Sequence, residues 1–68
     1  MKTPGVEAAL DYLEWHADEE GYDADFLEEC ATKFNAVRVP FLHNAKICRE
    51  RARNIRANVE TLREIALT

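Results

Sequence analysis

The residues best suited to chemistry in this sequence are two histidines and two cysteines. His16 and His43 lie in different segments, as do Cys30 and Cys48, so the chain contains neither an H-E-x-x-H pair nor a C-x-x-C pair. His16 stands near two glutamates that could join it in binding a metal ion. A solvent-facing histidine on an acidic helix is the favoured interpretation, and we expect no metal and no cofactor.

The acidic run "HADEEGYDAD" resembles a calcium-binding loop in composition only. An EF-hand loop needs oxygen ligands at positions 1, 3, 5, 7, 9 and 12 and glycine at position 6. With Asp18 in first place, Asp23 stands where the glycine belongs and Phe26 falls at position 9. The pattern fails, and a solvated helix-capping turn is favoured. The remaining carboxylates fall on predicted solvent faces, so we expect no enzyme activity.

A row of arginines in "CRERARNIRANVETLRE" is the strongest candidate for binding a charged ligand. On a helix, Arg49, Arg53, Arg56 and Arg63 share one face, which could follow a phosphate backbone. The pI of about 5.0 and the lack of a helix-turn-helix pattern make nucleic-acid binding the alternative interpretation and not the first one.

Size and composition predict one small folded unit spanning residues 1–68. The chain is 47% hydrophobic and 32% charged with only two glycines and two prolines, which excludes a disordered class. A chain this short builds a marginal core, and oligomerisation is one common remedy. It has no apolar run of membrane-spanning length and no leader pattern, so we expect a cytoplasmic protein without a membrane partner. Free buried thiols are favoured, and a single disulfide bridge stays open.

The charges are divided between the two halves of the chain. Residues 1–32 hold ten acids against Lys2, and residues 33–68 hold eight bases against three acids. Such a division indicates either a charged partner or two helices of one bundle facing each other.

The apolar periodicity predicts an all-α chain with helices at about 4–20, 24–35 and 40–66. Thr3 and Pro4 suit a helix start, and Gly21 suits a left-handed stop. Asp23 or Asp25 would cap the second helix, which carries an apolar stripe and ends at Asn35. The segment "AVRVP" is β-branched and precedes proline, so we expect an extended linker there.

The third predicted helix carries an unbroken heptad seam. Its positions are Phe41, Ala45, Cys48, Ala52, Ile55, Val59, Leu62 and Ala66. A helix seamed along its whole length needs a partner of similar length, so we expect a helical bundle or coiled coil completed by homodimerisation. The arginine row flanks this seam, and a row of acids at the same spacing flanks the first helix: Glu7, Asp11, Glu14 and Asp18.

These features favour a small non-enzymatic protein–protein interaction module, acting as an adaptor, inhibitor or regulator on an unidentified protein. The expected contact lies on the first helix and the turn after it, at Tyr12, Trp15, Asp18, Glu19, Glu20 and Tyr22. A competing interpretation, favoured for Tyr12 and Trp15, is that both side chains widen the core face of that helix.

Overall fold

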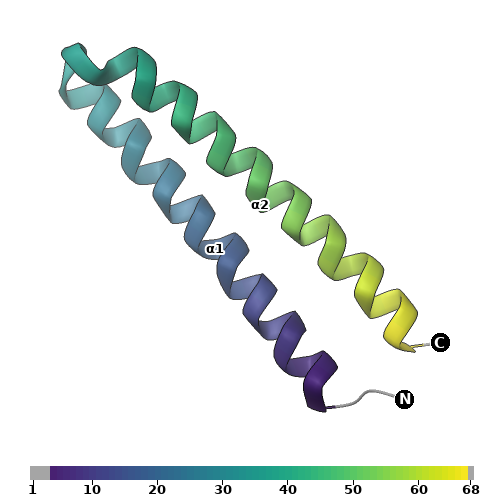
Figure 1. Ribbon diagram of the computed structural model, residues 1–68. Coiled ribbons are helices and arrows are strands. Elements are labelled where there is room, and N and C mark those ends of the chain that lie inside the picture. The colour runs from purple at the N-terminus through teal and green to yellow at the C-terminus, as the bar shows by residue number, and fades with distance from the viewer. Residues whose placement is uncertain (1–3, 68) are drawn as a thin grey trace.

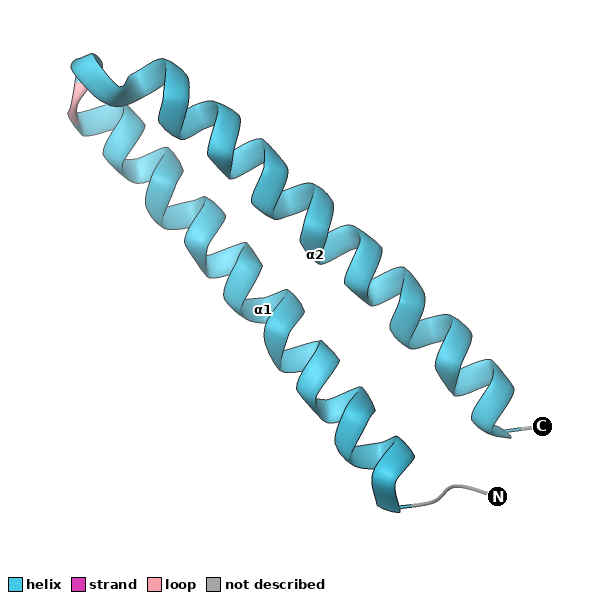
Figure 2. Cartoon of the chain, in the orientation of Figure 1, coloured by secondary structure: helices cyan, strands magenta, loops and turns pink. Residues whose placement is uncertain are grey.

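The chain folds as an antiparallel helical hairpin. The computed structural model describes residues 4–67, with α1 at Pro4–Lys33, a short 3₁₀ turn η1 at Asn35–Val37 and α2 at Arg38–Leu67 (Figure 1). Every described residue except Phe34 is helical (Figure 2). The two helices lie side by side in a rod of 52 × 15 × 11 Å. The all-α class is therefore confirmed, and the predicted long C-terminal helix is present.

The prediction of three helices is wrong, because α1 runs without interruption through the expected break. Gly21 is a helical residue and does not have a positive φ, and Asp23 and Asp25 lie inside the helix and do not cap a new one. The predicted N-cap, Thr3, lies outside the described residues.

A matched heptad explains why the helix continues through Gly21. A mid-helix glycine costs about 1 kcal/mol relative to alanine. A helix break at Gly21 would move Ala24 and Ala31 out of line with Ala17. A continuous helix keeps all three alanines on one line facing α2. All three are at most 2% exposed. The packing of a full-length partner helix outweighs the local stop signal.

The connection between the helices, residues 34–37, lies earlier than predicted, and only Phe34 in it has an extended backbone. The amide of Phe34 donates to the carbonyl of Cys30 at 2.8 Å, and that of Val37 donates to the carbonyl of Phe34 at 3.1 Å. α2 then begins at Arg38, so Pro40 falls in its first turn. The first four amides of a helix have no partner within it, so proline there loses no hydrogen bond. The expected pre-proline linker is therefore absorbed into the helix.

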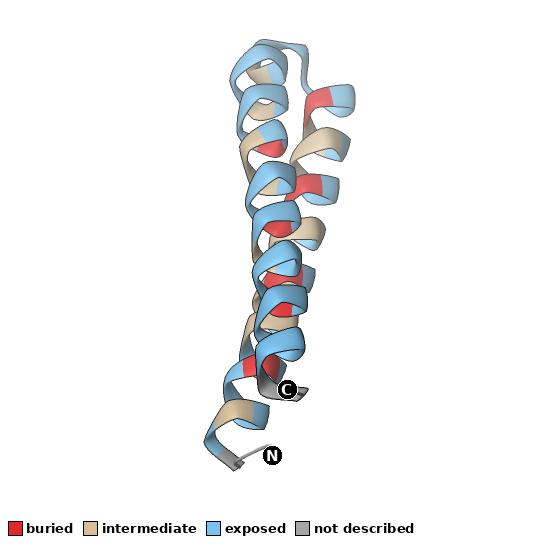
Figure 3. Ribbon diagram, turned by 90° about the vertical axis from the view of Figure 1, so that its right-hand side faces the viewer, coloured by how far each residue is buried: buried red, intermediate tan, exposed pale blue. Residues whose placement is uncertain are grey.

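Small side chains form the contact between the helices. The buried residues recur every seven positions on each helix, on the sides that face each other (Figure 3): Leu10, Ala17, Ala24, Ala31, Ala45, Ala52 and Val59. The predicted seam of α2 therefore divides into two rows. Ala45, Ala52 and Val59 are buried, whereas Phe41, Cys48 and Ile55 are half-buried and Leu62 is exposed.

Replacing Gly21 with alanine should stabilise the hairpin by about 0.5–1 kcal/mol, because glycine weakens a helix interior. A Cβ atom at this position meets nothing within 4 Å. Urea unfolding at fixed protein concentration measures the change. A loss of stability would instead indicate a left-handed helix end at Gly21.

Replacing Ala24 with leucine should destabilise the hairpin by at least about 1–3 kcal/mol, since Ala24 is 0% exposed and a larger side chain must push the helices apart. Ala57→Leu, on an exposed position of α2, is the matched control and should change the unfolding free energy by less than about 0.5 kcal/mol. Equal effects of the two substitutions would contradict the alanine contact.

Candidate protein-binding surfaces

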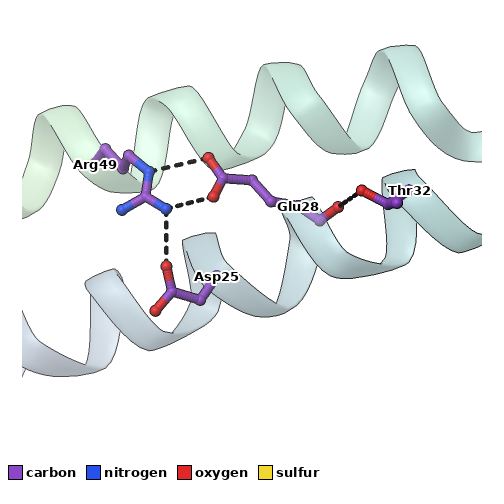
Figure 4. Close-up of polar contacts among 4 residues, drawn as sticks. All are labelled: Asp25, Glu28, Thr32 and Arg49. Carbon is purple, nitrogen blue, oxygen red and sulfur yellow. Dashed lines mark hydrogen bonds and ion pairs between the residues drawn. The ribbon is translucent and has the colours of Figure 1, made fainter.

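One edge of the helix–helix contact is closed by arginine–carboxylate pairs, and we call it the ion-pair side. Arg49 binds two carboxylates of α1 (Figure 4). Its Nε donates to Glu28 Oε2 at 3.0 Å, and its Nη2 donates to Asp25 Oδ1 at 2.8 Å and also to the second oxygen of Glu28. Arg56 Nη2 donates to Asp18 Oδ1 at 3.2 Å, and Arg63 donates to Glu14.

The arginine row therefore meets the acidic half of its own chain. Of the expected acidic row, Glu14 and Asp18 accept from Arg63 and Arg56. Arg49 pairs instead with Asp25 and Glu28, which the three-helix prediction had placed on a separate helix. Only a continuous α1 brings them opposite Arg49.

These pairs lie at the surface, so they orient the helices more than they stabilise them. The hydrogen bonds from Arg49 hold the pKa of Glu28 below its ordinary value of 4.5, and the same contacts raise the pKa of Arg49. Of the four arginines of the candidate nucleic-acid face, three are thus engaged by carboxylates. Arg53 forms no ion pair within residues 4–67.

The opposite edge of the helix–helix contact carries a partly uncovered apolar row from each helix, and we call it the open face. Its members lie three residues after, or four before, the buried positions: Val6, Leu13, Glu20 and Leu27 on α1, and Phe41, Cys48, Ile55 and Leu62 on α2. Seven of the eight are half-buried, and Leu62 is 40% exposed. The hairpin alone does not cover these side chains.

A polar group interrupts the open face near its middle. The side chain of Glu20 is 13% exposed, and its Oε1 lies 3.5 Å from His16 Nε2. Burial, and then the hydrogen bond and charge of Glu20, raise the pKa of the Cys48 thiol. Cys30 and Cys48 are both free thiols. A thiol with a raised pKa is a poor nucleophile, so this group does not have the properties of a reactive cysteine site.

A second apolar surface runs along the side of α1 that faces away from α2. Its aromatic side chains are 57–66% exposed and fall within an arc of about 80° on the helix: Tyr12, Trp15, Tyr22 and Phe26. We call it the aromatic stripe. The rings of Tyr12 and Trp15 lie 6.0 Å apart at their centroids.

The favoured interpretation of Tyr12 and Trp15 as core residues is therefore wrong. Tyr12 and Trp15 are 60% and 57% exposed, whereas Ala17, five positions after the first and two after the second, is buried against α2. Tyr22 lies on the same face of α1 as these two residues, and so does Phe26, which the expected contact did not include. The signal that would have found Phe26 is its place four residues after Tyr22, on the same helix face.

The other expected contact residues divide between the surfaces. Asp18 belongs to the ion-pair side, and Glu20 turns toward the open face. Glu19 falls within the arc of the aromatic stripe.

Near the stripe, Asp11, Glu19 and Asp23 form no ion pair within the described part of the chain. Lys33, the single lysine or arginine of α1, is engaged by Glu29 at 3.0 Å. The stripe therefore has a negative rim.

Among residues 4–67, no three His, Cys, Asp or Glu side chains gather in a way that would hold a metal ion. Neither α1 nor α2 has a stretch apolar enough to cross a membrane. No family model, no curated protein and no solved structure matches this chain.

Replacing Glu28 with glutamine should lower the melting temperature at pH 7 and should make little difference in acid. A carboxylate whose pKa is lowered by folding stabilises the protein above its unfolded pKa, and this contribution is lost as pH falls through the folded value. The gap between wild type and variant should close between about pH 5 and pH 3.

Glu60→Gln, which removes an exposed carboxylate that has no arginine partner among residues 4–67, is the matched control. It should show little pH-dependent gap. High salt should shrink the effect at Glu28, because exposed ion pairs are screened. A gap at Glu28 that persists unchanged at pH 3 would contradict the ion pair.

Proposed function

We propose that this chain is a non-enzymatic interaction module that binds another protein through the aromatic stripe of α1. The observation that supports this proposal is that small side chains are buried between the helices while large aromatic ones are exposed. Alanines occupy the contact between the helices, whereas four aromatic side chains on one face of α1 are more than half exposed. Aromatic residues dominate the binding energy of protein interfaces, and soluble monomers rarely leave such a row uncovered.

The chemistry of the stripe indicates what kind of surface it would bind. Trp15, Tyr22 and Phe26 are spaced by seven and four residues, which is the spacing with which an amphipathic helix fills an apolar groove. The carboxylates at its rim favour lysine or arginine around that groove. Binding would act by occluding or recruiting the partner, as an adaptor, inhibitor or regulator does.

We further propose that the module is a homodimer. The rows of half-buried apolar side chains on the open face lie on a different side of α1 from the aromatic stripe, so one surface can self-associate while the other binds. The nucleic-acid alternative gains no support from the geometry, because phosphate would have to displace carboxylates from Arg49, Arg56 and Arg63.

Replacing Trp15 or Phe26 with alanine should weaken partner binding by about 30-fold, the effect of losing an anchor worth about 2 kcal/mol. The fold should survive, because these side chains are 57% and 64% exposed. A photo-crosslinking residue at position 15, used in cells of the source organism, identifies the partner. Titration calorimetry with that partner then measures each dissociation constant.

Matched controls lie on α2. A crosslinker at Ala57 should not capture the same partner, and Val39→Ala, at a position 79% exposed, should leave the dissociation constant nearly unchanged. If position 15 captures nothing that position 57 does not, the stripe is not a binding surface and the proposal fails.

A further inference from the structure

We propose that a second copy of this chain docks on the open face and forms a four-helix bundle in which α1 of each copy packs against α2 of the other. Both turns then lie at one end of the bundle, and Asp23 of one copy faces Arg51 of the second copy. This inference rests on the proposed homodimer and specifies its surface and its orientation.

The exposed area of the hairpin is too large for a compact monomer. The chain exposes 5222 Å², whereas a compact protein of 7.8 kDa exposes about 4400 Å². The difference, about 800 Å², is the area that each partner loses in a standard interface. The radius of gyration is 15.5 Å, against about 11 Å for a globular domain of this length. A second copy of equal length supplies the missing layer.

The side chains of the open face fit a bundle core. The contact inside the hairpin contains Leu10 and Val59 as its only buried side chains larger than alanine among those described. The larger apolar groups, such as Leu13, Phe41 and Ile55, form the rows beside it. Two open faces placed together bring four rows into one interior, as in helical bundles whose core positions repeat every seven residues. A two-fold axis makes such a face complementary to itself.

Charge distinguishes the two orientations that a two-fold axis allows. With the turns at opposite ends, acidic α1 faces α1 of the second copy, which sets like charges together. With the turns at one end, α1 faces α2, and acids face bases. Like charges across an interface disfavour association, so the second orientation is preferred.

The register identifies one pair of residues in this orientation. Asp25 binds Arg49, which places these residues at the same level of the hairpin. Asp23 lies two positions before Asp25 and Arg51 two positions after Arg49, so in antiparallel helices they are level as well. A two-fold axis along the bundle keeps that level. Each of the two lies one helical turn from a row of the open face, and the charges of both affect the pKa of the Cys48 thiol.

Neither member of this pair has an ion-pair partner among residues 4–67 of its own copy. Asp23 and Arg51 are exposed and form no ion pair in the described residues. Arg51 lies about 200° around α2 from Arg49 and so faces away from the ion-pair side, where the carboxylates of α1 bind the other arginines. The proposed dimer gives both residues a partner of opposite charge, twice by symmetry.

Sedimentation equilibrium at about 10–100 µM tests the surface. Wild type should have twice the chain mass of 7.8 kDa. Ile55→Glu, in the open face, should give a monomer, whereas Ala57→Glu, on an exposed position of the same helix, should remain dimeric. A monomeric wild type overturns the inference, and so does a dimer that survives Ile55→Glu.

Charge substitutions test the orientation without changing the apolar core. Asp23→Arg or Arg51→Asp alone should weaken the dimer by about 2- to 30-fold, and the double substitution should restore wild-type affinity. Asp11→Arg is the matched control and should have little effect. If neither single substitution weakens the dimer, the turns lie at opposite ends and the proposed orientation is wrong.

The proposed dimer and the proposed partner site can be disproved independently of each other. A dimer that survives while position 15 captures no protein leaves this inference intact and removes the partner site. A dimer lost on Trp15→Ala but kept in Ile55→Glu assigns self-association to the aromatic stripe and overturns this inference. A stable monomer that still crosslinks a partner through position 15 overturns the dimer and leaves the partner site.

Discussion

The rest of this structure depends on the contact of alanines between two long helices. Ala17, Ala24 and Ala31 on α1 and Ala45 and Ala52 on α2 are at most 3% exposed. Alanine costs no side-chain entropy in a helix and lets helix backbones approach closely. The same choice leaves little apolar volume between the helices, so the larger side chains must lie beside or outside the contact. The open face and the aromatic stripe are both results of this packing.

Charge complements what the alanines leave unspecified. A row of alanines is tolerant of sliding, because each position resembles the next. Arginines at the same seven-residue spacing lie along one edge of the contact, where each is matched by carboxylates of α1. Each pair contributes little to stability in water, and because Asp11, Asp18 and Asp25 also repeat every seven residues, a slide of one heptad would form new pairs in place of the old ones. The division of acids and bases therefore favours packing of α1 against α2, while the short turn at Asn35–Val37 limits the register.

The sequence predicted the all-α class and the long C-terminal helix with its heptad seam, because an uninterrupted heptad pattern is a strong signal. It did not predict the continuity of α1, since Gly21 and the aspartates after it are ordinary signs of a helix end. Those signs describe local preference only, and the opposing 30-residue helix overrides them. The residues of the expected contact do not all lie on one surface. Tyr12, Trp15 and Tyr22 share a surface, but which side of α1 faces inward depended on alanines that carry no strong hydrophobic signal.

The ladder of arginines along one edge also has a consequence for how the hairpin forms. Arg49 meets Glu28 across 21 residues of chain, Arg56 meets Asp18 across 38, and Arg63 meets Glu14 across 49. Loop-closure entropy grows with the logarithm of loop length, so closing the outermost contact first costs about 0.75 kcal/mol more than closing the innermost. Contacts of low sequence separation also form fastest. Both effects favour closure of the hairpin from its turn, with the contact between Arg49 and Glu28 forming before the other two.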